Sequence, residues 1–148
     1  MAVALKRVLG VDYGNRRIGL AISDAAGVVA RPLATVERWN DRQAAEEIAA
    51  IAAEEKVDLI VVGLPVSLSG EESHAARAVR RFAGELEKRT LLPIAFHDER
   101  LTTAEVEKIL LADDVSRAGR KRVRDQLAAA LILQSYLDQS RGGGEGEG

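Results

Sequence analysis

The chain has 148 residues, of which 47% are hydrophobic and 30% charged, a composition typical of a single globular domain with a buried core. Its formal net charge is −2, which excludes an overall positive field, so any binding of nucleic acid requires a local basic patch. Only 3% of the residues are aromatic, which leaves few platforms for stacking unpaired bases.

The start of the chain and its cysteine content bear on location. The first residues lack the long apolar core of a signal peptide, and no apolar run approaches the length of a membrane span. The absence of cysteine excludes disulfides and cysteine-bound zinc and fits a reducing compartment. We therefore expect a cytoplasmic protein without membrane contact.

The first part of the chain predicts three antiparallel strands. Runs of β-forming residues at 7–12 and 17–23 flank a turn at 13–16 whose glycine and asparagine are typical of a hairpin. A further extended run at 28–36 contains Pro32, which favours an edge strand.

The rest of the chain alternates helices and strands. In chain order we expect a helix capped by Asn40 or Asp41, a strand at 58–63, a helix at 71–88, a strand at 92–96, a helix from Thr102 or Thr103 to 111, and a helix at 123–139. The polar, basic segment 112–122 is expected to be mobile. The glycine and glutamate tail at 140–148 predicts disorder, so one domain spans 1–139.

This order of elements predicts an α/β fold. Three antiparallel strands followed by two α-β units form a five-stranded mixed sheet with helices on both faces. Right-handed crossovers place the fourth strand beside the first. The carboxyl ends of these two strands then meet at one edge, where ligands bind in open α/β sheets.

Acidic residues from three remote parts of the chain reach that edge. Asp12 ends the first strand, Asp98 and Glu99 end the last, and Asp125 lies in the first turn of the last helix, on the side of its apolar stripe. Converging carboxylates repel one another unless they bind protons or metal, and oxygen ligands suit Mg²⁺ or Mn²⁺. Two such ions, roughly 4 Å apart, can activate water for phosphodiester cleavage.

Each acid also has a simpler explanation. Asp12 alone could be a turn residue. A carboxylate buried at that position would, however, be costly without a compensating cation. Asp98 and Glu99 could be solvated charges or partners of Arg100. Asp125 could be an acid favoured by the helix dipole. The meeting of all of them at one edge favours a shared metal site.

Serines and basic residues accompany the acids. Ser67 and Ser69 precede a predicted helix, where hydroxyl and N–H groups can hold phosphate, although alone this is more simply a strand-to-helix loop. Basic residues usually form a solvated face, but beside proposed metal ligands they suit a phosphate backbone. These basic residues are Arg16, Arg17, Arg100, Arg120, Lys121 and Arg122. Trp39 is interpreted as a partly buried packing residue.

Four motifs follow one another along residues 5–138. They are Gly10-Val-Asp-Tyr-Gly-Asn-Arg-Arg-Ile-Gly-Leu-Ala-Ile-Ser-Asp24, Gly63-Leu-Pro-Val-Ser-Leu-Ser-Gly70, Asp98-Glu-Arg-Leu-Thr-Thr103 and Val123-Arg-Asp-Gln-Leu-Ala-Ala-Ala-Leu-Ile-Leu-Gln-Ser-Tyr-Leu137. Together they resemble the YqgF/RuvX-type family of Holliday-junction-resolvase-like nucleases.

The resemblance implies a ribonuclease H-like nuclease domain in a cytoplasmic bacterial enzyme that matures the 5′ end of precursor 16S rRNA. Junction resolution is the older proposal for the family. Carried over by position, the acidic site is Asp12, Glu99 and Asp125, with Asp98 as a substitute or helper.

Three interpretations stay open. The first is an Mg²⁺- or Mn²⁺-dependent endonuclease acting on structured RNA, with Asp12 bridging the ions. The second is a resolvase of branched DNA, which needs two sites and hence a dimer. No strong dimer helix is evident, so we expect a monomer or weak homodimer. The third is a non-catalytic RNA-binding factor on ribosomal particles; an ATPase is disfavoured because no Walker motif occurs.

Overall fold

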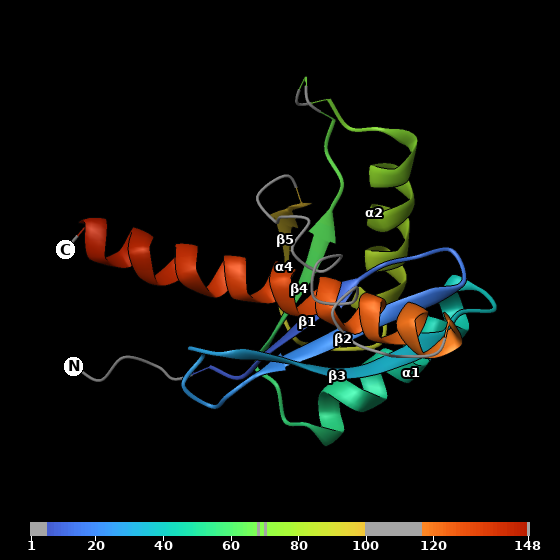
Figure 1. The fold of residues 1–148 in the computed structure, drawn as a ribbon, viewed down its shortest axis with the longest axis horizontal. Coiled ribbons are helices and arrows are strands. Elements are labelled where there is room, and N and C mark those ends of the chain that lie inside the picture. The colour runs from blue at the N-terminus through green and yellow to red at the C-terminus, as the bar shows by residue number, and fades with distance from the viewer. Residues whose placement is uncertain (1–5, 68, 70, 100–116, 148) are drawn as a thin grey trace.

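The computed structural model describes residues 6–67, 69, 71–99 and 117–147 (Figure 1). Its elements are β1 (Val8–Asp12), β2 (Arg17–Ser23), β3 (Ala30–Glu37), α1 (Asp41–Glu54), β4 (Leu59–Leu64), α2 (His74–Glu87), β5 (Ile94–Asp98) and α4 (Arg117–Glu147). The helix expected at 102–111 and the segment 112–116 lie outside the described residues.

The five strands form one mixed sheet in the order β3-β2-β1-β4-β5, which confirms the predicted fold class. β1 pairs with β2, and β2 with β3, in antiparallel fashion, whereas β4 runs parallel to both β1 and β5. β4 is buried along its whole length, as an unbroken apolar run predicts for a central strand. Pro32 lies in β3, at the edge of the sheet, where a missing N–H is tolerated.

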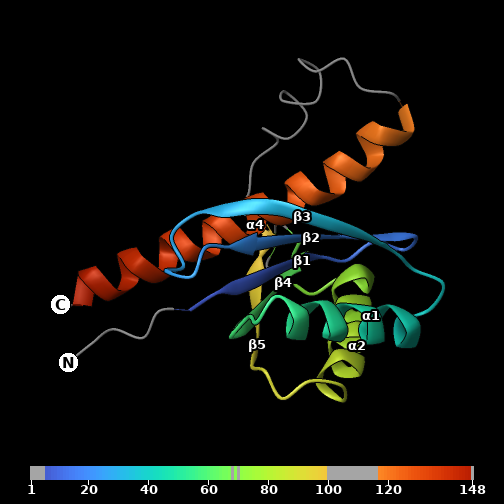
Figure 2. The same ribbon diagram turned by 90° about the horizontal axis from the view of Figure 1, so that it is seen from below.

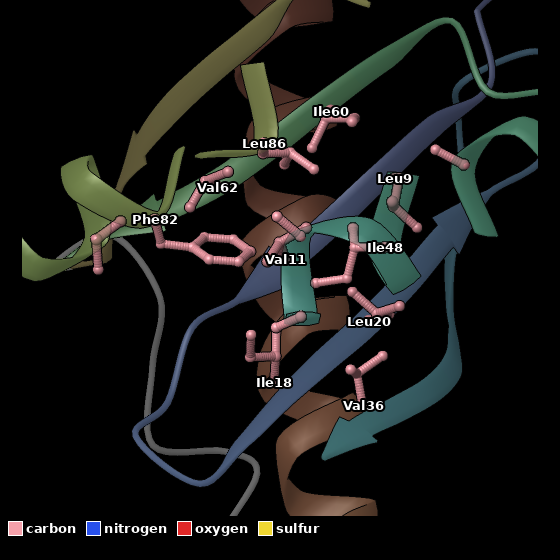
Figure 3. Close-up of a cluster of buried hydrophobic side chains, with 14 of the residues drawn as sticks. Leu9, Val11, Ile18, Leu20, Val36, Ile48, Ile60, Val62, Phe82 and Leu86 are labelled. Carbon is pink, nitrogen blue, oxygen red and sulfur yellow. The ribbon is translucent and has the colours of Figure 1, made fainter. Parts of the chain in front are cut away.

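Helices cover both faces of the sheet (Figure 2). α1 and α2 pack on one face, against alternate strand residues such as Leu9, Val11 and Leu20 (Figure 3). α4 packs on the other face, where its apolar stripe meets Val8 of β1 and Val61 of β4. Successive side chains of one strand therefore serve two separate cores, and the sheet is buried from both sides.

Side-chain caps set the starts of α1 and α2. Asn40 caps α1 and forms a capping box with Gln43. Of the two alternative caps that the sequence predicts, Asn40 is therefore the one used. Ser73 caps α2, which begins at His74 rather than at 71 because the Ser73 hydroxyl accepts from the N–H of Ala76.

α4 is longer than predicted at both ends. It begins at Arg117, so 117–122 is helical rather than mobile, because its arginine, lysine and alanine residues are good helix formers. The helix also continues to Glu147, whereas the sequence predicts disorder over 140–148. Extension of an existing helix needs no new nucleus, which offsets part of the cost of the glycines. Neither α4 nor any other described helix is apolar enough to cross a membrane.

Candidate active site

Asp12 ends β1 at the edge of the sheet where a ligand site is expected. Its cross-strand partner in β2 is Gly19, and the preceding residue, Val11, pairs with Val62 of β4. Gly63 therefore follows at the level of Asp12 on β4. A glycine thus stands beside Asp12 on each neighbouring strand, and both allow another part of the chain to come close to the sheet.

The backbone of α4 uses the space at Gly19. A Cβ atom placed on Gly19 would lie 1.9 Å from the backbone oxygen of Asp125, so the helix touches β2 directly opposite Asp12. Asp125 faces the sheet, as its place on the apolar stripe predicts. It lies about two turns beyond Arg117 rather than in the first turn, so the helix dipole does not explain this acid.

Glu99 uses the space at Gly63 in the same way. A Cβ atom on Gly63 would lie 3.1 Å from Oε2 of Glu99 and 2.6 Å from Cδ1 of Ile132. Gly63 pairs with His97 of β5, so the chain needs only two further residues to bring Glu99 back over β4. Asp98, the last residue of β5, pairs with Leu64.

The three carboxylates are electrostatic neighbours. Burial raises the pKa of Asp12 to about 7, and the negative charges of Glu99 and Asp125 add to this effect. Burial also raises the pKa of Glu99, with a further contribution from the charge of Asp98. Glu99 and Asp125, and not Asp98, are thus the carboxylates that act on Asp12. Ionisation of Asp12 is therefore unfavourable in this position, and the carboxyl group either keeps its proton or binds a cation.

Arg17 forms an ion pair with Asp125 rather than with Asp12. Its Nε atom lies 2.9 Å from Oδ2 of Asp125, and the two side chains are 27% and 22% exposed. No ion pair within the described part of the chain includes Asp12. Arg17, expected to contact phosphate, therefore balances one of the three acids.

The donor chemistry of this cluster fits a hard divalent cation. Three carboxylates supply only oxygen ligands, and burial together with the charges of Glu99 and Asp125 raises the pKa of Asp12, so a cation beside Asp12 would stabilise its ionised form. In the present side-chain arrangement, no three acidic or histidine side chains of the described residues are close enough to hold one ion. Joint binding therefore requires the Asp125 and Glu99 carboxylates to turn toward Asp12.

The two serines of the second motif serve their own loop. The hydroxyl oxygens of Ser67 and Ser69 lie 2.8 Å apart, and the Ser67 hydroxyl donates to the backbone oxygen of Glu71 at 3.0 Å. A bridge between Val66 and Glu72 closes the loop, and α2 begins only at His74. The serines therefore do not lie at the helix N-terminus that the phosphate interpretation requires.

The remaining basic candidates are only partly covered by the structure. Arg16 is exposed in the hairpin turn. Arg122 is exposed and lies 3.5 Å from a carboxylate oxygen of Glu37. Arg100 and the side chains of Arg120 and Lys121 lie outside the described residues.

Sequence reasoning missed a cluster of hydrogen-bonded polar side chains that stabilises the turn after Asp12. The Tyr13 hydroxyl donates to Oδ1 of Asp41 at 2.7 Å, and Nε of Arg38 donates to the same oxygen at 2.8 Å. Nη1 of Arg38 also donates to the backbone oxygen of Asn15 at 2.9 Å. Burial and Asp41 raise the pKa of Tyr13 to about 12, so its hydroxyl stays protonated. No local pattern links these residues, because they meet only through the fold.

We predict that Asp12 lowers the stability of the metal-free protein at neutral and higher pH. Its pKa is about 7 when folded and about 3.8 when unfolded, so the folded state binds more protons between these values. Stability from this group is therefore lost as the pH rises from about 4 to about 7, by on the order of a few kcal/mol. In thermal melts with a chelator, the advantage of Asp12→Asn over wild type should be larger at pH 8 than at pH 5. A difference independent of pH would contradict the raised pKa.

Comparisons with known proteins show the family of this chain and agree with its fold. A model of the family described as "RuvX: Holliday junction resolvase" matches residues 6–139. The chain is 43% identical over 136 residues to the "Putative pre-16S rRNA nuclease" of Thermoanaerobacter pseudethanolicus, covering 91% of this chain and 98% of that protein. A protein of the same description from Desulforudis audaxviator is 43% identical over 137 residues, covering 93% and 97%.

Solved structures with little sequence identity share the fold. RuvC of T. thermophilus, in complex with a Holliday junction substrate, has a TM-score of 0.56 and 18% identity, covering 93% of this chain and 96% of that chain. The fowlpox virus Holliday junction resolvase has a TM-score of 0.53 and 12% identity, covering 90% and 99%. With the family model matched over residues 6–139, this chain belongs to the RuvX family of nucleases, hydrolases that act on phosphodiester bonds.

Proposed function

We propose that this protein is a metal-dependent endonuclease that cleaves structured RNA, and that its substrate in the cytoplasm is the 5′ end of precursor 16S rRNA. One observation carries the metal dependence: Asp12 is half-buried, and this burial together with the charges of Glu99 and Asp125 raises its pKa to about 7. The similarity to proteins described as pre-16S rRNA nucleases supports the choice of substrate.

Asp12, Glu99 and Asp125 are proposed as the metal ligands, with Asp98 as a helper through its charge on Glu99. Bound Mg²⁺ or Mn²⁺ supplies the positive charge that activates water and stabilises the leaving oxygen. Above pH 7 Asp12 is mostly ionised and can serve as a ligand. When the Asp125 carboxylate turns toward Asp12, it releases Arg17, whose guanidinium is then available for a phosphate.

The basic residues near this edge are proposed to hold the RNA backbone. Arg16 and Arg17 lie in or beside the hairpin turn that follows Asp12, and Arg122 lies one turn of α4 before Asp125. Their guanidinium groups match the geometry of phosphate oxygens. Arg100, Arg120 and Lys121 complete the proposed contact set.

A resolvase of branched DNA is the second candidate, because the description of the matching family model names that activity. Resolution of a junction takes two symmetric cuts, so this candidate requires a dimer. A monomer or weak homodimer fits cleavage of RNA at a single point.

We expect the wild-type protein to cut a precursor 16S rRNA fragment in Mg²⁺ or Mn²⁺ and to lose this activity in EDTA. Activity should return when the metal is added in excess, because the three carboxylates need a cation between them. Cleavage is measured by gel analysis of labelled RNA, and a four-way DNA junction is treated in parallel. Cleavage that persists in EDTA contradicts the metal dependence, and symmetric cutting of the junction alone contradicts the RNA substrate.

A further inference from the structure

The single tryptophan of the chain is exposed. Trp39 lies between β3 and α1, and 82% of its surface is accessible, so its interpretation as a partly buried packing residue is wrong. Its backbone is held in place, since the Trp39 N–H donates to Oε1 of Gln43 at 2.7 Å. An indole ring on a fixed backbone, with both faces largely open to solvent, is a ready surface for stacking.

A basic groove begins at the residue after Trp39. It has a volume of about 640 Å³, and its lining includes Asn40, which follows Trp39 directly, and the cationic side chains of Arg42, Arg81, Lys88 and Arg89. Arg42 belongs to α1 and Arg81 to α2, and Lys88 and Arg89 follow directly after α2. The groove therefore gathers positive charge from two helices in a chain whose net charge is −2.

The acids of the groove do not cancel this charge. Glu85 pairs with Lys88 and Arg89, and Glu46, beside the groove, lies 3.7 Å from Arg42 and 3.8 Å from Arg89. Asp41 pairs with Arg38, which lies outside the groove lining. Arg81 is exposed and forms no ion pair with any described residue. Five cations, with Arg38 included, against the three carboxylates of Asp41, Glu46 and Glu85 leave a surplus of positive charge that can meet phosphates.

The groove lies at the same edge of the sheet as the acidic site. Arg17 at the start of β2 pairs with Glu37 at the end of β3, just before Trp39. The Tyr13 hydroxyl, one residue after Asp12, reaches Asp41 in the groove lining. Val11 and Tyr13 face α1 and α2, so Asp12 between them faces the α4 side of the sheet. A strand of nucleic acid that crosses Asp12 therefore reaches the groove by passing around this edge of the sheet at Tyr13.

We propose that Trp39 and the basic groove bind a single-stranded segment of RNA that flanks the cleavage point. The inference rests on the proposed function, because it assumes that the neighbouring acidic site cuts RNA. An unpaired base stacks on Trp39, since an exposed indole ring can take only a base that is free of its duplex partner. Arg42, Arg81 and Lys88 hold the phosphates on either side of that base. This surface distinguishes single-stranded from double-stranded RNA but not one sequence from another, because every base offers a face for stacking.

The fluorescence of Trp39 reports on this surface directly, because no other tryptophan contributes. The full chain carrying Asp12→Asn, in EDTA, is titrated with a short oligouridylate, which forms no duplex. We expect the emission to be quenched in a saturable way, with an affinity that falls as salt rises. A blunt RNA duplex of equal length should quench much less. No quenching by oligouridylate, or equal quenching by the duplex, overturns the proposal. An absence of quenching is also the result expected if this surface binds a protein partner.

Variants assign the binding to the groove. Measured by anisotropy of labelled oligouridylate, Trp39→Ala should weaken binding by roughly 5-fold or more, the loss of one stacked base. Arg81→Ala should weaken binding and reduce its salt dependence, whereas Arg31→Ala, an exposed arginine at the far end of β3, should do neither. If Trp39→Ala and Arg81→Ala bind oligouridylate as tightly as Arg31→Ala, the inference is overturned. Cleavage is measured separately, so wild type that cuts RNA without quenching refutes only this surface, and quenching without cleavage refutes only the nuclease proposal.

Discussion

Asp12→Asn is expected to lower metal-dependent cleavage of precursor 16S rRNA by roughly 100-fold or more, since a lost metal ligand removes several kcal/mol of transition-state stabilisation. Asparagine keeps the size of the side chain but removes the charge that Glu99 and Asp125 surround. Initial rates of cleavage on a labelled RNA fragment, in saturating Mn²⁺ and then Mg²⁺, measure the effect.

The matched control for this variant is Asp24→Asn. Asp24 lies just after β2, at the end opposite the acidic edge, and its Oδ1 accepts from the N–H groups of Val28 and Val29. Asparagine retains an oxygen for these bonds, so this variant should cleave like wild type. Circular dichroism should show that both variants are folded. Full activity of Asp12→Asn would remove Asp12 from the catalytic site.

Gly19→Ala is expected to destabilise the protein by about 3 kcal/mol, at the upper end of the usual cost of overpacking a close contact. The added methyl group would lie 1.9 Å from the backbone oxygen of Asp125 and 3.0 Å from its Cβ atom. Backbone cannot rotate away as a flexible side chain can, so α4 must lift from β2. Urea or thermal unfolding measures the loss, and weaker Mn²⁺ binding should accompany it because Asp125 moves with the helix.

Gly84→Ala is the control for the glycine substitution. Gly84 lies within α2, and a Cβ atom there would have no atom within 4 Å beyond its own turns of the helix backbone. Alanine at this position should leave stability unchanged or raise it by up to about 1 kcal/mol, through its better helix propensity. If Gly19→Ala unfolds at the same denaturant concentration as wild type, the tight seating of α4 on β2 is wrong.

The sheet was predictable because its signals are local. The runs of β-forming residues in β1 and β2 and the unbroken apolar run of β4 each follow from a few neighbouring residues. Right-handed crossover then brings β4 beside β1, so the meeting of Asp12 with an acid after β5 follows from topology alone. The place of Asp125 on the apolar stripe of its helix was equally readable.

Features that depend on contacts between remote side chains were not predictable. The pairing of Arg17 with Asp125 joins residues that no local pattern connects, and it gives Arg17, which was expected to contact phosphate, an acid as its partner in the metal-free protein. The exposure of Trp39 could not be read from its neighbours either, because an aromatic residue between two elements is buried or open according to how those elements pack. The start of α4 at Arg117 was missed because a basic run was interpreted as a mobile loop.

Calorimetric titration of Mn²⁺ into wild type and Asp12→Asn at pH 6.5, in two buffers of different ionisation enthalpy, tests the central claim most directly. A shared metal site predicts that wild type binds Mn²⁺ and releases protons, because Asp12 has a pKa of about 7 and is mostly protonated at that pH. The same site predicts no comparable binding to Asp12→Asn. Equal Mn²⁺ affinity in the two proteins, without proton release, would contradict the assignment of Asp12, Glu99 and Asp125 as a metal site.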